Sequence, residues 1–211
     1  MRLIDLDVNA FLDVLASEAP APGGGSTAAL LGACGAGLGA MTTNLTLGRK
    51  KYEPLWENAQ MRQAEAMRLK SAFAEAIDAD TAAFDRVMEA LHLPKDTDEQ
   101  KAARRAAIEA ANKGAVQPPL RVLQLCRETV AILEGLSGKV NPNCASDLGV
   151  AAAALEAAAK GAWLNVCINL GGVADADFTA AAKAEAKAVY DDVLPRAEAV
   201  FAAAERACQN A

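Results

Sequence analysis

The sequence predicts an all-α fold: one domain over residues 1–211, built as a bundle of about seven helices. Apolar residues recur at helical spacing along the chain, and no segment alternates cleanly enough to be a strand. Hydrophobic residues make up 53% of the chain but aromatic residues only 4%, which indicates a core of alanine and aliphatic side chains on closely packed helices. A length of 211 residues suits one well-buried domain.

Local start and stop signals place the helices in order. Asp5 or Asp7 can cap a first helix that ends near Ser17, and Ser26 is the expected N-cap of the second. Pro54 fits the first position of a third helix that ends near Leu91. The remaining signals are a capping box at Thr97 for a fourth helix, Pro118-Pro119 separating it from a fifth, Ser146 capping a sixth that ends near Leu170, and a seventh from about Ala176 to Cys208.

The second helix is unusual because it carries no charge from residue 27 to residue 47. Such a helix has no polar face, so most of its sides must be buried. Gly35 and Gly39 are four residues apart and would let another backbone approach closely. A membrane span is the rival interpretation. The absence of an aromatic belt and the polar residues at its end argue against a span; these residues are Thr42, Thr43, Asn44 and Thr46.

A glycine-rich loop precedes this helix. Pro20 and Pro22 exclude a helix there, and three glycines at 23–25 leave the backbone free to turn with positive φ. The N–H groups at the start of the following helix suit a carboxylate or another electron-rich group of a ligand, so Gly24, Gly25 and Ser26 are candidate binding residues. A tight interhelical turn is the alternative. The loop is not a phosphate loop, because the motif G-x-x-x-x-G-K-[ST] does not occur.

Asp80 interrupts the apolar stripe of the third helix, between Ile77 and Phe84. Packing alone does not place a carboxyl group there. Burial raises the pKa of a carboxyl group unless a cation or several donors lie beside it, and either protonation state serves proton transfer. Asp80 is therefore the candidate catalytic residue, and a structural carboxylate that ties a neighbouring helix is the alternative. The stripe as a whole comprises Leu69, Phe73, Ile77, Phe84, Val87 or Met88, and Leu91.

Polar residues at both ends of the sixth predicted helix form a second group of candidates. Asn165 and Asn169 project from apolar faces, and buried amides need partners from other helices or from a ligand. Asn141, Ser146 and Asp147 gather at the start of the helix. A capped helix with an Asn-Pro turn explains this second cluster equally well.

Three consecutive bases, Arg49, Lys50 and Lys51, follow the uncharged helix beside Tyr52 and near Asn44. The default interpretation is a solvated cluster that complements the C-terminal end of the helix dipole. The alternative is a binding site for an anionic group, because the protein as a whole is acidic.

Charge and composition exclude several classes of function. The formal net charge of −6 gives little electrostatic support for nucleic-acid binding. Five scattered cysteines without a C-x-x-C pair indicate a reduced, cytoplasmic protein without a zinc cluster, and the single His92 offers no set of metal ligands. The acidic N-terminal segment does not have the pattern of a signal peptide.

Five segments together resemble the cyclodeaminase/cyclohydrolase family of tetrahydrofolate enzymes. This family comprises formimidoyltetrahydrofolate cyclodeaminase domains and stand-alone methenyltetrahydrofolate cyclohydrolases. The segments occur in the family's order over nearly the whole chain, and they are PAPGGGST, NLTLGRKKYE, DADTAAFDRVMEALHLPKDTDE, NPNCASDLGVAA and LNVCINL. Two departures are small: Arg49 stands where lysine is also common, and Cys144 occupies a variable place in its motif.

The resemblance implies an all-helical, homodimeric folate enzyme that needs neither a redox cofactor nor a metal. In the cyclodeaminase reaction, N10 of 5-formimidoyltetrahydrofolate attacks the amidine carbon and ammonia leaves. In the cyclohydrolase reaction, water attacks the same carbon of 5,10-methenyltetrahydrofolate. Together with the residues above, the resemblance implies that Asp80 moves the proton, and that Lys50 sets the charge of Asp80 and orients the water or amine. It also implies that Arg49 or Lys51 receives the glutamate carboxylates of the folate, which can be polyglutamylated.

Within the same resemblance, the glycine loop with Ser26, together with Asn141, Ser146 and Asp147, would hold the pterin or the benzoylglutamate. Three other classes of protein stay open at this point. One is a non-catalytic helical scaffold that dimerises through the glycine-rich helix, the second is a small membrane-associated protein, and the third is a folate-binding module without chemistry.

Overall fold

The computed structural model describes residues 2–210, and this part of the chain contains helices and no strand. The predicted all-α class is confirmed. The α-helices are α1 (Val8–Leu15), α2 (Gly24–Asn44), α3 (Trp56–Leu91), α4 (Asp98–Leu136), α5 (Ala145–Leu170) and α6 (Ala176–Gln209). Three short 3-10 helices complete the set: η1 (Leu3–Asp5), η2 (Lys50–Leu55) and η3 (Pro142–Cys144).

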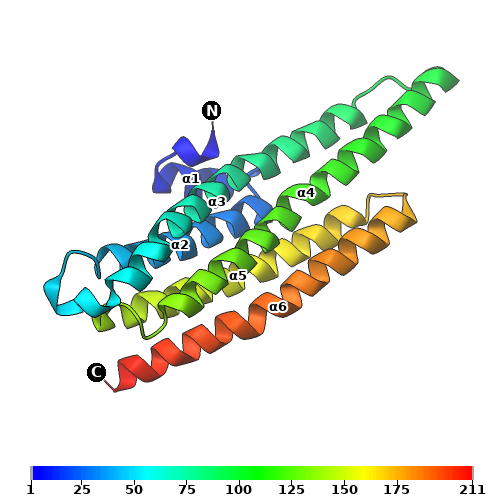
Figure 1. Cartoon of the computed structure of the whole chain (residues 1–211). Coiled ribbons are helices and arrows are strands. Elements are labelled where there is room, and N and C mark those ends of the chain that lie inside the picture. Colours follow the sequence, from blue (N-terminus) through cyan, green and yellow to red (C-terminus); the bar gives the residue numbers. More distant parts are fainter. Residues whose placement is uncertain (1, 211) are drawn as a thin grey trace.

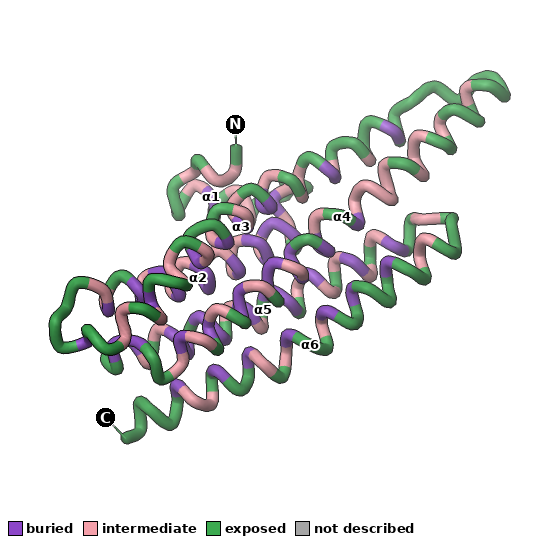
Figure 2. Tube along the Cα trace, viewed as in Figure 1, coloured by how far each residue is buried: buried purple, intermediate pink, exposed green. Residues whose placement is uncertain are grey.

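Helices α2 to α5 form the centre of the bundle. In this group α2 contacts α3 and α5, while α4 contacts the same two helices from the other side. The long helix α6 covers α4 and α5, and the short N-terminal segment lies against α3 (Figure 1). The tips of α3 and α4 extend beyond this packed region as a hairpin, and the tube of Figure 2 is mostly exposed there.

Glycines let α2 approach its neighbours closely, as the sequence predicts. A Cβ atom at Gly35 would lie 3.0 Å from the carbonyl oxygen of Ala151 on α5, and one at Gly39 would lie 3.0 Å from Leu133 on α4. Helices α2 and α5 are antiparallel, and further along this pair a Cβ atom at Gly161 of α5 would lie 3.1 Å from Cβ of Ala28 on α2. Most of α2 is therefore buried among protein helices. Within residues 2–210, no helix has both the length and the hydropathy that a bilayer crossing requires.

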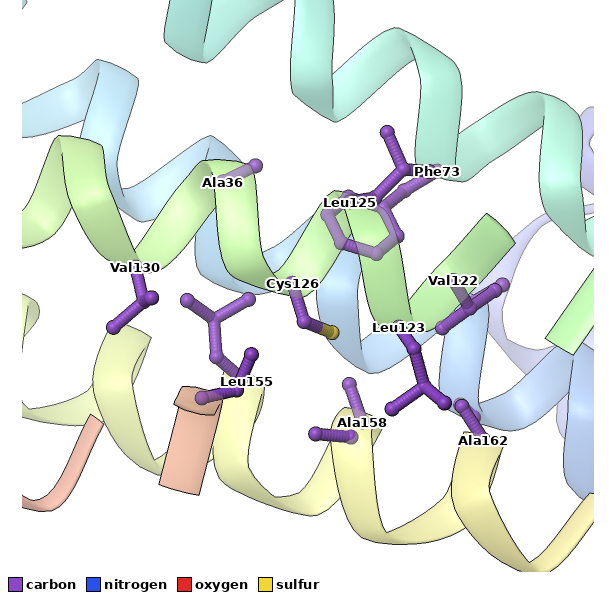
Figure 3. Close-up of a cluster of buried hydrophobic side chains, with 14 of the residues drawn as sticks. Ala36, Phe73, Val122, Leu123, Leu125, Cys126, Val130, Leu155, Ala158 and Ala162 are labelled. Atoms are coloured by element: carbon purple, nitrogen blue, oxygen red, sulfur yellow. The ribbon is translucent and has the colours of Figure 1, made fainter. Parts of the chain in front are cut away.

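The core consists of alanine and aliphatic side chains with Phe73 as its largest fully buried member. Figure 3 shows how side chains from α2, α3, α4 and α5 meet around it. The stripe predicted on α3 divides into two parts. Leu69, Phe73 and Ile77 are fully buried, whereas Phe84 and Val87 are only partly buried, near a cavity described below.

Gly32 of α2 lies directly beneath the ring of Phe73, and a Cβ atom at this position would overlap the ring. Overpacking a core costs about 1–3 kcal/mol, whereas replacing a helical glycine by alanine gains about 0.8–1.0 kcal/mol. We therefore expect Gly32→Ala to lower the free energy of unfolding, measured by guanidinium titration. Gly37→Ala on the same helix is the matched control, because its nearest neighbour, Lys70 Cγ, is 3.9 Å away. Equal shifts in both variants would contradict this account.

Pro118 and Pro119 do not separate two helices, so the predicted count of about seven is wrong for residues 2–210, which contain six α-helices. Helix α4 runs through both prolines. A proline inside a helix leaves the carbonyl four residues earlier without its usual donor. For Pro119 that carbonyl is Ala115 O, and the side chain of Asn169 on α5 donates to it at 2.6 Å. Burial of Pro119 in the packing between helices further supports the continuous helix.

Two predicted caps are confirmed and two are wrong. Asp7 caps α1 by accepting from Ala10 N, and Thr97 forms the predicted capping box with Gln100. Ser26 is not a cap, because α2 starts two residues earlier and the Ser26 hydroxyl points at α3. Ser146 is not a cap either, because η3 leads directly into α5, so that the chain is already helical at residue 145.

Candidate active site

A cavity of about 380 Å³ lies where the N-terminal end of α2 meets α3, α4 and the C-terminal end of α5. This volume falls at the lower end of the range for small-molecule sites. The glycine loop forms one wall, α3 a second, and α4 with α5 a third. The lining residues are Pro20, Ala21, Gly23, Gly24, Gly25, Asp80, Thr81, Ala83, Phe84, Val87, Asn112, Ala115, Asn165, Ile168, Asn169 and Gly172.

Asp80 projects from α3 into this cavity and is half-buried. The Ser26 hydroxyl lies 3.1 Å from Asp80 Oδ2 and 3.1 Å from the carbonyl oxygen of Ile77. A Cβ atom at Gly25 would overlap the Asp80 carboxylate. Glycine is thus required at position 25 so that the carboxylate can approach the backbone of α2.

The need for glycine here is this close approach, not the positive φ that the sequence suggests. Among the described residues, Gly48 and Gly138 have positive φ, and neither belongs to the loop. The sequence predicts an electron-rich ligand group at the start of α2. In the structure the Asp80 carboxylate of the chain itself lies there and accepts from the Ser26 hydroxyl.

Burial raises the pKa of Asp80 above its ordinary value, and the hydrogen bonds from the Ser26 side chain and backbone oppose this rise. A carboxyl group with a raised pKa is better matched to proton transfer near neutral pH than an exposed one. Asp80 therefore combines access to a cavity with a pKa shifted in the useful direction. Its partners within the chain are uncharged.

Asn165 and Asn169 also line the cavity, and Asn165 lies against the glycine loop, since a Cβ atom at Gly24 would lie 3.2 Å from its Nδ2. The Asn165 amide donates to Gly161 O at 2.8 Å, and Asn169 donates to Ala115 O. The sequence reasoning missed Asn112 of α4, which lines the same wall and donates to Gly172 O in the connection after α5. No local pattern singles out Asn112. Only the continuous path of α4 past the two prolines brings it beside α5.

The basic triplet lies at the opposite end of α2. Arg49, Lys50 and Lys51 follow its C-terminal end and are exposed. Asp80 packs against the first turn of α2, which has 21 residues; at about 1.5 Å per residue the helix is about 30 Å long. The expected pairing of Lys50 with Asp80 is therefore not formed within one chain, and the physical reason is the rigid α2 helix between them.

The other predicted residues at this distal end have separate surroundings. Asn141 is buried, and its amide donates to Leu45 O and accepts from Asn143 N, so both ends of the amide have partners within the chain. Tyr52 is also buried, with Lys51 Nζ 5.5 Å from its ring centre. Exposed Asn44 accepts from Gln63.

Ser146 and Asp147 lie in the first turn of α5 at the same distal end. Together with Asn141, Ser146 lines a second cavity of about 770 Å³, which lies between the α4–α5 connection and the C-terminal end of α6. Asp147 and Arg49 are both close enough to influence the Cys144 thiol, whose pKa is raised by burial and by Asp147 and lowered by Arg49. The site residues predicted from the sequence thus form two groups at opposite ends of the α2–α5 pair. Within residues 2–210, no three His, Cys, Asp or Glu side chains gather closely enough to hold a metal ion.

Comparison with known proteins places the chain in a family. The formiminotransferase-cyclodeaminase family profile matches residues 7–188. Methenyltetrahydrofolate cyclohydrolase of Methylorubrum extorquens is 43% identical over 171 residues, covering 81% of this chain and 82% of that protein. Mouse formimidoyltransferase-cyclodeaminase is 36% identical over 177 residues, which cover 83% of this chain but 32% of the mouse protein.

A solved structure agrees with these sequence matches. The crystal structure of formiminotetrahydrofolate cyclodeaminase from Thermotoga maritima superimposes with a TM-score of 0.78 at 26% identity, covering 93% of this chain and 96% of that one. The resemblance that the five sequence segments suggest is therefore confirmed. The chain belongs to the formiminotransferase-cyclodeaminase family.

Proposed function

We propose that this protein is a folate enzyme that acts at the carbon bridging N5 and N10 of tetrahydrofolate, and that it hydrolyses 5,10-methenyltetrahydrofolate to 10-formyltetrahydrofolate. The observation that carries the proposal is the half-buried Asp80 carboxyl group, with its raised pKa, in the cavity of a chain that is 43% identical to a methenyltetrahydrofolate cyclohydrolase. Cyclisation of 5-formimidoyltetrahydrofolate with release of ammonia is the second candidate. The Thermotoga cyclodeaminase structure favours it.

Both reactions pass through a tetrahedral carbon between N5 and N10, so both need a group that moves protons. In hydrolysis, Asp80 would take a proton from the attacking water and return it to the departing ring nitrogen. In cyclisation, the same carboxyl group would move a proton from the attacking N10 to the departing amine. Proton transfer alone balances either reaction, and we therefore propose that no redox cofactor or metal takes part.

The test follows the methenyl absorbance of purified protein with each substrate separately. Enzyme-dependent loss of absorbance with 5,10-methenyltetrahydrofolate supports the cyclohydrolase. Appearance of absorbance and ammonia from 5-formimidoyltetrahydrofolate supports the cyclodeaminase. If neither substrate reacts at a rate above the uncatalysed one, the enzyme proposal is wrong. Folate binding without turnover would then favour a binding module, and its absence would favour a helical scaffold.

We further propose that two copies of the chain pair through the outward face of α2 and α5. On α5 this face exposes three large apolar side chains, Val150 at 58%, Leu164 at 66% and Ile168 at 74%. The adjoining α2 carries no charged residue from end to end. An exposed apolar face of this kind is typical of a protein interface, and a two-fold axis pairs the same patch with itself.

An antiparallel two-fold pairing would also unite the separated site residues. The distal end of α2 in one copy, with Lys50, would lie beside the Asp80 end of α2 in the other. Lys50 of the second copy could then orient the water or amine, and Arg49 or Lys51 could receive the glutamate carboxylates of the folate. A location in the cytoplasm fits the five unpaired cysteines and is part of the same proposal.

A further inference from the structure

Three asparagine side chains, which we call the amide wall, line one side of the Asp80 cavity: Asn112 from α4 and Asn165 and Asn169 from α5. We infer that the amide wall binds the 2-amino-4-oxopyrimidine edge of the pterin ring, by accepting hydrogen bonds from its N–H groups. This inference deepens the proposed function and rests on it for the choice of ligand. It assigns the cavity to one end of the folate and the glutamate tail to a place outside it.

All three amides have the same arrangement. In each, Nδ2 donates to a backbone carbonyl: Asn112 to Gly172 O, Asn165 to Gly161 O at 2.8 Å, and Asn169 to Ala115 O at 2.6 Å. No described residue donates to the Oδ1 atom of any of the three, and none of these oxygens is among the buried atoms without a partner. The cavity thus offers three accessible amide oxygens as acceptors.

The backbone bonds also fix which way each amide points. Flipping the Asn169 amide by about 180° would exchange Nδ2 and Oδ1 and place Oδ1 against Ala115 O, where two acceptors would repel each other. The Ala115 carbonyl needs this outside donor because Pro119, four residues later, has no N–H. Because Pro119 leaves Ala115 O free to accept from Asn169 Nδ2, Asn169 Oδ1 stays available as an acceptor. The carbonyl of Gly172 accepts from Asn112 Nδ2 and so leaves Asn112 Oδ1 available in the same way.

The charge of the lining agrees with a donor-rich ligand. Asp80 is the one ionisable residue that lines the cavity within residues 2–210, and the lining includes no Lys, Arg or His. Lys113, one residue from Asn112, is paired with Glu109 and Asp175. Such a lining disfavours the glutamate carboxylates and suits an aminopyrimidine edge, beside which the positively charged methenyl carbon would face Asp80. A volume of about 380 Å³ also suits a single ring system.

Binding of folate fragments to the 211-residue chain tests this inference. Isothermal titration would compare 6-methyltetrahydropterin with its 2-dimethylamino analogue, which has the same ring without the exocyclic donors. We expect the wild type to bind the first at least about tenfold more tightly than the second, because an amide oxygen that the bound analogue covers would be left without a donor. Asn165→Leu should weaken binding of 6-methyltetrahydropterin by about tenfold and reduce its advantage over the analogue.

Asn210→Leu is the matched control, since Asn210 donates to the carbonyl four residues earlier at 2.8 Å, as Asn165 does, but lies at the exposed end of α6. It should leave both affinities unchanged. Binding of 4-aminobenzoylglutamate should be insensitive to Asn165→Leu. Equal affinity of the wild type for the two pterins, or no binding of 6-methyltetrahydropterin, would overturn the inference without any variant.

The outcome is separable from that of the proposed function. Discrimination between the pterins without turnover of either folate substrate would keep the amide wall and reject the enzyme. Turnover by a wild type that does not discriminate between the pterins would keep the enzyme and reject the amide wall.

Discussion

Asp80→Asn is expected to lower kcat by about 10²- to 10⁴-fold, the usual contribution of a positioned general acid or base. Asparagine has nearly the same shape and can still accept from Ser26, so the cavity and the affinity for folate should change little. What it cannot do is exchange a proton with water or a ring nitrogen. The measurement is the methenyl assay under single-turnover conditions, with binding followed separately by isothermal titration.

Asp78→Asn is the matched control for this variant. Asp78 lies two residues earlier on α3, where it accepts from Leu3 N and faces the N-terminal segment instead of the cavity. We expect its kcat to be within about twofold of the wild type, because it does not contact the reacting atoms. A near-normal rate for Asp80→Asn would reject the proton-transfer role.

The raised pKa of Asp80 should also make the free energy of unfolding depend on pH. Because the folded state binds this proton more tightly than the unfolded state, the stability contributed by the protonated carboxyl group is fully present below its ordinary pKa and is lost as the pH rises through its folded-state pKa. Asp80→Asn does not titrate. Its free energy of unfolding relative to the wild type should therefore increase with pH across that window and then level off. In the wild type, kcat/KM should fall as the pH drops through the same window if Asp80 acts as the base.

Lys50→Met is the second substitution expected to have a large effect, about 10²-fold on kcat, although Lys50 and Asp80 lie at opposite ends of α2 in one chain. The reason is the proposed pairing of two copies, in which each site takes Asp80 from one copy and Lys50 from the other. Co-expression of the Asp80→Asn and Lys50→Met chains should restore activity. In a mixed dimer one site has both native residues and the other has neither, so random pairing gives about a quarter of the wild-type activity.

Two controls make this experiment decisive. Lys95→Met changes an exposed lysine on the α3–α4 connection and should leave the rate unchanged. Leu164→Glu, which places a charge on the proposed interface, should yield a monomer in analytical ultracentrifugation and prevent recovery of activity in co-expression. Recovery that never exceeds the sum of the two separate variants would contradict a shared site.

Several features of the fold could be predicted from the sequence because they depend on local chemistry. The Asp7 cap and the Thr97 capping box involve residues within three positions of each other. The uncharged composition of α2 requires burial wherever the helix lies. Asp80 could be singled out because an acidic residue within an apolar stripe contradicts the periodicity around it. The continuous path of α4 through Pro118 and Pro119 could not be predicted in this way, because the carbonyl that Pro119 leaves without a donor is satisfied by a distant residue, Asn169 on α5.

The sequence by itself determined the helical class, the family and the residue types that the chemistry requires, since periodicity, caps and motifs are properties of neighbouring residues. Only the tertiary structure decided which of those residues meet. It joined Asp80 to Gly25 and Ser26 through the contact of α3 with the start of α2, and it added Asn112 through the path of α4. It also separated Lys50 from Asp80, because Asp80 lies at the first turn of α2 and Lys50 follows its last turn, and a helix of 21 residues keeps its two ends apart.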